Sequence, residues 1–138
     1  MKKIQFSIDR TPPSLNTLLN MNYFKVRKLQ RIWDLLIYEQ WIYNRRFVFC
    51  RPVRIKYVIS FISTRRRDVD NYVGGTKLVT DALKRTFIPR DDSEWVRGIT
   101  VEFRGGNPET LIHIEEDVDH GKREIEEENT ERGDNESI

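Results

Sequence analysis

The chain has 138 residues, and its 24 Lys and Arg residues nearly balance its 22 Asp and Glu residues, giving a formal net charge of +2. The charge is unevenly distributed, because residues 115–138 contain 11 acids and 3 bases whereas residues 1–114 contain 11 acids and 21 bases. A hydrophobic fraction of 38% supports one packed domain, and this length leaves little room for a second. No apolar run is long enough to span a bilayer, so we expect a cytoplasmic protein without a membrane partner.

The first half of the chain predicts two strands separated by a long helix. Alternation of apolar and polar residues over Lys2–Ile8 indicates a half-buried strand, which a Pro-Pro pair ends. Apolar residues recur at spacings of three and four from Tyr23 to about Asn44, as in an amphipathic helix. The β-branched and aromatic segment Val53–Phe61 then predicts a second strand.

The second half predicts one more helix and two more strands. A polar, turn-like segment leads into a helix over roughly Thr76–Thr86, with Gly74 and Gly75 interrupting its start. The segments Val96–Phe103 and Leu111–Glu115 indicate strands, and the Gly-Gly-Asn-Pro sequence between them predicts a hairpin turn.

The predicted order is therefore β-α-β-α-β-β, an α+β (mixed α/β) single domain with one mixed sheet and two helices. We place this domain at residues 1–115. Residues 116–138 contain few apolar residues and many glutamates, which cannot offset the entropy cost of ordering, so we expect an acidic, disordered tail.

Five of the 11 acids in residues 1–114 fall within 25 positions. Two of them, Asp68 and Asp70, alternate along an extended or turning segment, so their carboxylates can converge on one point. Two carboxylates this close repel each other unless a cation lies between them, and Mg²⁺ takes such oxygen ligands. Acids within a basic surface are what a metal-dependent phosphodiesterase needs, since the bases hold the polyanion and the metal activates water. The five acids are Asp68, Asp70, Asp81, Asp91 and Asp92.

A purely structural interpretation stays open at this point. Asp-x-Asp-Asn is a common loop composition, and pairing with the preceding arginines would explain it without chemistry. Asp81 could cap a helix, pair with Arg85 or support the site from behind the ligands. The pair Asp91 and Asp92 could simply form a turn after Pro89.

The series Arg65–Asn71, Lys77, Asp81-Ala82-Leu83 and Asp91-Asp92 resembles the RusA family of Holliday junction resolvases, endodeoxyribonucleases of bacteria and their prophages. The segment Pro12–Asn16 is also similar to that family, and the resemblance covers residues 4–115 in the same order. It implies a mixed α/β fold, a homodimer with two sites, and paired incisions across a four-way DNA junction. It also implies dependence on Mg²⁺, for which Mn²⁺ would substitute.

Roles for individual residues follow from the resemblance. It implies that Asp68, Asp70 and Asp92 bind the metal, and that Lys77 stabilises charge at the scissile phosphate. Asp81 and Asp91 would support these ligands. The family pattern is shorter between the Asp-x-Asp-Asn motif and the lysine, so the sequence Gly-Gly-Thr at 74–76 looks like an insertion.

Several basic and polar side chains are candidates for DNA contact, because each phosphate that they neutralise adds affinity. Solvated faces of a helix and a loop are the alternative interpretation. Tyr23 and Phe24 could wedge into an opened junction, although helix capping or core packing is the favoured role. The candidate DNA-binding residues are Asn16, Arg27, Lys28, Arg65, Arg66, Arg67 and Asn71.

The leading hypothesis is a Mg²⁺-dependent endodeoxyribonuclease that resolves Holliday junctions in DNA recombination and repair. One alternative is a less selective nuclease acting on flaps, forks or other branched DNA. Another is a non-catalytic protein that binds branched DNA and whose aspartates only organise a loop. The acidic tail could be a solvating extension, a competitor of DNA for the basic surface, or a docking segment for a basic partner.

Overall fold

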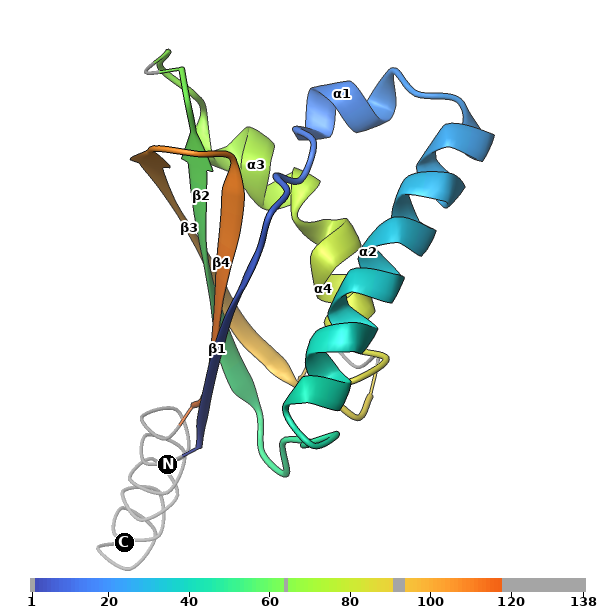
Figure 1. Ribbon diagram of the computed structural model, residues 1–138, viewed down its shortest axis with the longest axis vertical. Coiled ribbons are helices and arrows are strands. Elements are labelled where there is room, and N and C mark those ends of the chain that lie inside the picture. The colour runs from blue at the N-terminus through green and yellow to red at the C-terminus, as the bar shows by residue number, and fades with distance from the viewer. Residues whose placement is uncertain (1, 64, 91–93, 118–138) are drawn as a thin grey trace, which may run out of the picture.

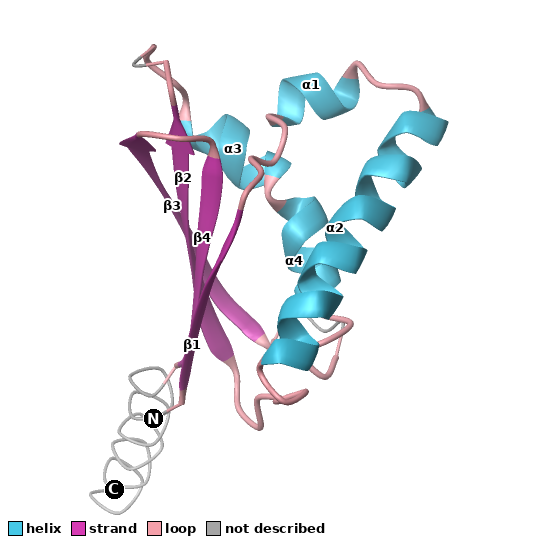
Figure 2. Ribbon diagram, viewed as in Figure 1, coloured by secondary structure: helices cyan, strands magenta, loops and turns pink. Residues whose placement is uncertain are grey.

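A four-stranded sheet carries helices on one of its faces in the computed structural model, which describes residues 2–63, 65–90 and 94–117 (Figures 1 and 2). The predicted class, a single α+β domain with a mixed sheet, is confirmed. In chain order the elements are β1 (Lys3–Ile8), α1 (Leu15–Leu19), α2 (Tyr23–Tyr43), β2 (Val53–Phe61), α3 (Val69–Gly75), α4 (Lys77–Leu83), β3 (Val96–Gly105) and β4 (Glu109–Glu116).

The strands lie in the order β1-β4-β2-β3, so β2 occupies an interior position. β2 pairs in parallel with β3, whereas β4 runs antiparallel to both β1 and β2. Parallel neighbours need a crossover connection, and α3 and α4 provide it between β2 and β3. The carboxyl ends of β2 and β3 therefore meet at one edge of the sheet, the upper edge in Figure 1.

The predicted hairpin between the last two strands is wrong. β3 and β4 both exist, but each pairs with β2, which lies between them. The connection crosses the end of β2, where the Gly106 N–H donates to the Phe61 carbonyl at 3.0 Å. Gly106 has a φ of +146°, a conformation that favours glycine. The Gly-Gly-Asn-Pro sequence thus marks a turn, but not a hairpin.

The prediction of two helices is also wrong, because the described residues contain four. The long helix is found almost as predicted, as α2, and the second predicted helix corresponds to α4. α1 and α3 were not predicted. They have five and seven residues, and helices this short depend on tertiary packing more than on local propensity.

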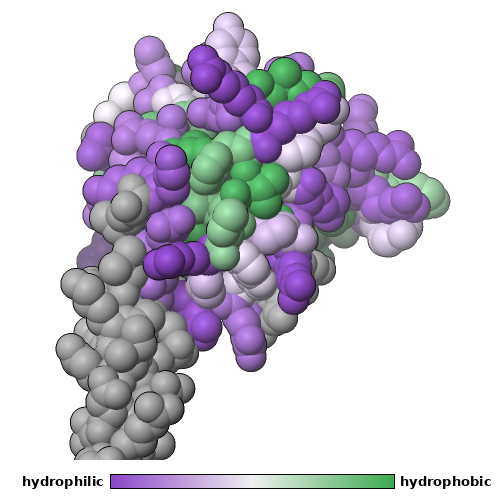
Figure 3. Space-filling view, turned by 90° about the horizontal axis from the view of Figure 1, so that it is seen from below, coloured by the Kyte–Doolittle hydropathy of each residue, from purple (hydrophilic) through white to green (hydrophobic). Residues whose placement is uncertain are grey.

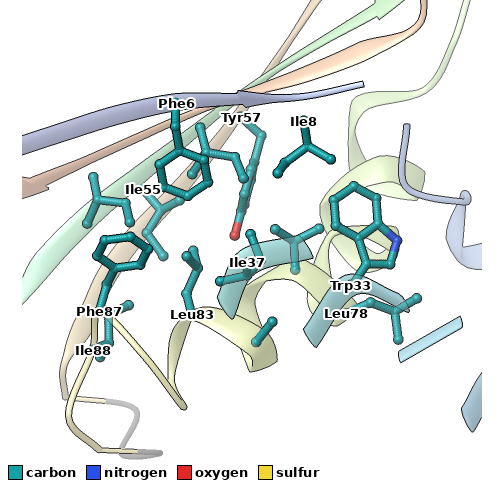
Figure 4. Packing of buried hydrophobic residues seen from close by; sticks show 14 of the residues in the cluster. Phe6, Ile8, Trp33, Ile37, Ile55, Tyr57, Leu78, Leu83, Phe87 and Ile88 are labelled. Atoms are coloured by element: carbon teal, nitrogen blue, oxygen red, sulfur yellow. The ribbon is translucent and has the colours of Figure 1, made fainter. Parts of the chain in front are cut away.

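The core lies between the sheet and the helices (Figure 4). Trp33 and Ile37 of α2 are fully buried, as are most inward side chains of β2 and β4. Phe6 of β1 stacks on Phe87, which follows α4, at a centroid distance of 5.4 Å. Within the core the Tyr57 hydroxyl hydrogen-bonds the Thr80 hydroxyl at 2.7 Å, joining β2 to α4. These core contacts fix α4 on the sheet, and α3 directly precedes α4 in the chain.

The two ends of the molecule differ. α1, α3, the start of α2 and the loop after β2 lie at the upper end in Figure 1, whereas the described chain leaves at the lower end, after β4. The face seen from below has hydrophobic residues at its centre and hydrophilic ones around them (Figure 3). Ile42, near the end of α2, and Val48, between α2 and β2, are exposed hydrophobic residues. Within the described residues, no helix combines the length and the hydropathy needed to cross a membrane. The tail predicted to be disordered falls, from residue 118 on, outside the described residues.

Candidate functional site

A cluster of three aromatic rings holds α3 at the upper edge of the sheet. Phe61 ends β2, Tyr72 lies in α3 and Phe103 lies near the end of β3. The ring centroid of Tyr72 is 5.4 Å from that of Phe61 and 5.3 Å from that of Phe103, both with edge-to-face geometry. Such contacts contribute about 0.5–1.5 kcal/mol each beyond the area that they bury. One side of α3 is therefore fixed to the sheet.

Asp68 and Asp70 stand at the start of this helix, and both side chains are exposed. Asp68 is the N-cap residue, and its Oδ1 accepts the Asp70 N–H at 3.0 Å. This bond is the reason why an Asp-x-Asp sequence begins a helix here. The bond occupies one oxygen of Asp68. The first two predicted ligands thus lie on one exposed turn.

Arg67 is half-buried, in contrast to the exposed Arg65 and Arg66. Its guanidinium carbon lies 3.7 Å from the centroid of the Phe61 ring, a cation–π contact. Its Nη1 donates to the carbonyl oxygens of Ser63 and Arg65, both at 3.0 Å. Arg67 thus holds the loop before Asp68 in shape, and Arg65 and Arg66 are the two arginines of this loop that reach solvent.

Asn71 and Asn16, predicted to contact DNA, contact each other. The Asn71 Oδ1 accepts the backbone N–H of Asn16 at 3.0 Å. Asn16 lies in α1, whose N-cap Ser14 accepts the Thr17 N–H. The Asn71 side chain is half-buried and that of Asn16 is exposed. This bond joins segments 55 residues apart and places α1 beside α3.

Lys77 is the first residue of α4 and is exposed. It follows Thr76, which is fully buried and whose hydroxyl donates to the Val73 carbonyl at 2.7 Å. The helical path therefore breaks between the acidic turn and the lysine, at the Gly-Gly-Thr sequence. Asp81 is half-buried one turn further along α4, and its charge acts on the Tyr57 phenol, whose pKa is raised mainly by burial.

One of the three interpretations left open for Asp81 was an ion pair with Arg85. Arg85 forms its ion pair with Asp34 of α2, so the interpretation of Asp81 as the partner of Arg85 is not supported. Gln30 donates to the same carboxylate of Asp34 at 2.9 Å. These contacts join α2 to the end of α4.

The start of α2 contributes further groups at the same end of the molecule (Figure 1). Arg27 and Lys28 are exposed, and the Arg27 guanidinium lies 5.4 Å from the centre of the Tyr23 ring. Tyr23 is 66% exposed and Phe24 is 80% exposed, so the favoured assignment of these two rings to helix capping or core packing is wrong. The helix cap is instead Asn22, which accepts the Lys25 N–H.

The carboxylates at the start of α3 fit a hard divalent cation. Mg²⁺ commonly takes one or two protein carboxylates together with water and phosphate oxygens, and Asp68 and Asp70 supply that donor chemistry. Among residues 2–63, 65–90 and 94–117, no group of three or more acidic, histidine or cysteine side chains could hold a metal. The predicted third ligand, Asp92, and its neighbour Asp91 lie outside the described residues.

Sequence reasoning missed the residues that hold the site in place, namely Tyr72 and Gly75. One signal was present in the sequence. A Gly-Gly pair within a helical region indicates close backbone approach, and a Cβ built on Gly75 would lie 1.8 Å from the Pro13 carbonyl oxygen. For Tyr72, nothing in the local pattern distinguished a ring packed on two strand ends from an ordinary helix residue.

Comparison with protein families matches residues 40–115 to the family described as endodeoxyribonuclease RusA, and these residues are more than half of the chain. The match includes the positions of all the predicted metal ligands and of Lys77, but it begins after Pro12–Asn16 and after the basic start of α2. A search of curated proteins finds no match. The family predicted from the sequence is confirmed: the chain belongs to the RusA family of endodeoxyribonucleases.

Proposed function

We propose that this protein is a Mg²⁺-dependent endonuclease that resolves four-way DNA junctions in recombination and repair, and that it acts in the cytoplasm as a homodimer. The observation that carries the proposal is the exposed pair Asp68 and Asp70 on the first turn of α3, inside the region matched to the family and next to exposed arginines. A surface built only to bind phosphates would be weakened by acids at this position.

Each group at the upper end has a role in the proposed reaction. Asp68 and Asp70 would hold Mg²⁺, with Asp92 as the proposed third ligand. When bound, the ion would polarise the scissile phosphate and lower the pKa of a water molecule. Lys77 would place its ammonium group against the charge that develops on the phosphate oxygens.

The remaining residues act on the polyanion. Arg65 and Arg66, together with Arg27 and Lys28 at the start of α2, would neutralise phosphates of the DNA arms, which makes binding sensitive to salt. Arg67 supports this surface by shaping the loop. Two copies related by a two-fold axis would present their sites to opposed strands, as paired incisions require.

The test is cleavage of a synthetic four-way junction with and without Mg²⁺, compared between the wild-type protein and Asp70→Asn. We expect paired nicks from the wild type, and from Asp70→Asn unchanged binding with a cleavage rate at least about 100-fold lower, because transition-state charge is no longer stabilised. Glu39→Gln, which removes one charge from an exposed position of α2, is the control and should cut normally.

Two further substrates and a mass measurement decide the remaining points. Equal cutting of flaps, forks and junctions would identify the less selective nuclease. Tight junction binding without cleavage under Mg²⁺ or Mn²⁺ would identify the non-catalytic DNA-binding protein. Sedimentation at equilibrium should give twice the chain mass of 16.6 kDa, and a monomer at working concentrations would contradict the homodimer.

A further inference from the structure

α3 carries the two acids of the site but is too short to hold its own position. A helix of seven residues is marginal in water, so its orientation depends on what it contacts. Tyr72 fixes one side of it to the ends of β2 and β3. The other side faces the segment 12–16, which the family match does not include.

Two contacts join α3 to this segment. At the first turn, the Asn71 Oδ1 accepts the Asn16 N–H at 3.0 Å. At the last turn, the backbone of Pro13 passes so close to Gly75 that an added Cβ would lie 1.8 Å from the Pro13 carbonyl oxygen and 2.9 Å from its carbonyl carbon. Gly75 is buried. The segment thus contacts α3 at both its first and its last turn.

The Gly-Gly-Thr sequence gains an explanation from these contacts. Gly74 and Gly75 lie within the helix, and neither has a positive φ, so backbone conformation does not require glycine at either position. Glycine inside a helix costs stability relative to alanine. At Gly75 the absence of a side chain lets the backbone of Pro13 come close, which explains why glycine stands there despite its cost. Thr76 then ends α3 with its bond to the Val73 carbonyl, so the next residue, Lys77, begins a new helix.

We propose that Asn71 and Gly75 are positioning residues, which clamp the segment 12–16 onto α3 and so fix the direction in which Asp68 and Asp70 are presented. This inference rests on the proposed function and extends it. The clamp also connects the acids to the corner formed by α1 and the start of α2, where Phe24 and Arg27 are exposed. The DNA-facing corner and the acidic turn would then move as one body.

The test compares Asn71→Ala, Gly75→Ala and their combination, with Gly105→Ala as the matched control. Both glycine variants add one methyl group, but at Gly105, the exposed last residue of β3, no atom of the described residues lies within 4 Å of the added Cβ. At Gly75 the nearest atoms are backbone. Junction cleavage should be measured at saturating and at limiting substrate, so that kcat and KM are separated.

We expect Asn71→Ala and Gly75→Ala each to lower kcat by about 10-fold or more, because small displacements of reacting groups are costly, with KM within about twofold of the wild-type value. The double variant should be no slower than the slower single variant, since both substitutions release the same clamp. Gly105→Ala should keep kcat within about twofold, because its methyl group meets open space. A raised KM with unchanged kcat for Asn71→Ala would show a DNA contact instead and overturn the proposal, as would additive losses in the double variant.

A readout that needs no cleavage separates this inference from the proposed function. The Asn16 amide donates to the Asn71 side chain, so Asn71→Ala should accelerate hydrogen exchange at Asn16 while the melting temperature changes little. Unchanged exchange would overturn the clamp whatever the activity. Faster exchange with undiminished kcat would overturn its role in positioning. If the wild-type protein cuts no DNA, the proposed function itself fails, and that outcome is seen before any variant is compared. Should Gly75→Ala not fold, Asn71→Ala carries the test alone.

Discussion

Lys77 and Asp70 lie on opposite sides of a break in the helical path, although both belong to the region matched to the family. In one continuous helix, their relation would follow from helical geometry alone. Here it depends on Thr76, which is fully buried and closes α3. The position of the lysine is therefore a property of the packed structure, and the residue itself is free to act as an exposed cation.

Lys77→Ala should slow junction cleavage about 100-fold at saturating DNA, because a positioned cation acts mainly on charge that develops in the transition state. Binding should weaken much less, since one phosphate contact among several is lost. Lys77→Arg should recover part of the rate. Single-turnover cleavage and binding measured at the same salt concentration test this, and Lys3→Ala, on the far strand β1, is the control. A proportional loss of binding and cleavage would contradict the assigned role.

Arg67 shows how a basic residue can support the proposed DNA-binding surface without facing it. Its side chain stacks on Phe61 and donates to two carbonyl groups of its own loop. The sequence of three arginines predicted three equivalent DNA contacts. The structure separates them, because the ring at the end of β2 offers a stacking surface to one guanidinium and leaves the other two in solvent.

At the scale of elements, α4 is tied to β2 by a buried pair of hydroxyl groups. The Tyr57 hydroxyl lies 2.7 Å from the Thr80 hydroxyl, which in turn lies 3.2 Å from the Thr76 carbonyl. Burial raises the pKa of Tyr57, so the phenol stays protonated and can donate. This chain of bonds connects the centre of the sheet to the residue at which α3 ends.

Removal of the Tyr57 hydroxyl and removal of the Thr80 hydroxyl should lower the free energy of unfolding by different amounts. Tyr57→Phe removes a donor and leaves Thr80 with its bond to the Thr76 carbonyl, which should cost about 1 kcal/mol. Thr80→Val leaves the Tyr57 hydroxyl buried without its partner, which should cost about 1–3 kcal/mol. Urea unfolding at neutral pH measures both. A smaller loss of unfolding free energy for Thr80→Val than for Tyr57→Phe would show that the Tyr57–Thr80 hydrogen bond is not the main source of stability at this position.

The elements that the sequence predicted well are those with a long periodic pattern. α2 begins at Tyr23 as expected, and β2 covers the predicted Val53–Phe61. α3 was missed because its first residues resemble a turn and its last two are glycines. The pairing of β4 was missed because a turn sequence is local, whereas the choice of partner depends on the interior strand β2.

The residues proposed for the candidate site came from the sequence, and their roles stay predictions, whereas the contacts that support them came from the structure. The acids, the lysine and the flanking arginines could be chosen from the sequence because their residue types and spacing carry the signal. The side chains that hold them act through contacts between segments far apart in the chain, such as Asn71 with Asn16. A single sequence does not encode such distances in any local pattern.

At the scale of the whole molecule, charge is divided along the chain, with 21 bases against 11 acids in residues 1–114. The sheet face away from the helices contains paired charges, including Lys56 with Glu102 at 3.1 Å and Lys3 with Glu115 at 3.8 Å. Within each exposed pair the two charges neutralise each other, and such pairs contribute little to the free energy of unfolding. The exposed bases near α3 belong to the end that we assign to DNA.

The acidic segment 118–138 provides the last prediction, because it holds eight acids against three bases. If its charge competes with DNA for the basic surface, removing it should strengthen binding to plain duplex several-fold and steepen the decrease of affinity with salt, since more counterions are then released from the protein and the DNA. Binding to duplex and to junction should be titrated between low and physiological salt. A full-length variant with Glu124, Glu126, Glu127 and Glu128 changed to Gln keeps the length and should behave like the truncation. Identical affinity and salt dependence in all three proteins would contradict competition with DNA and leave the solvating extension and the docking segment as the interpretations of the tail.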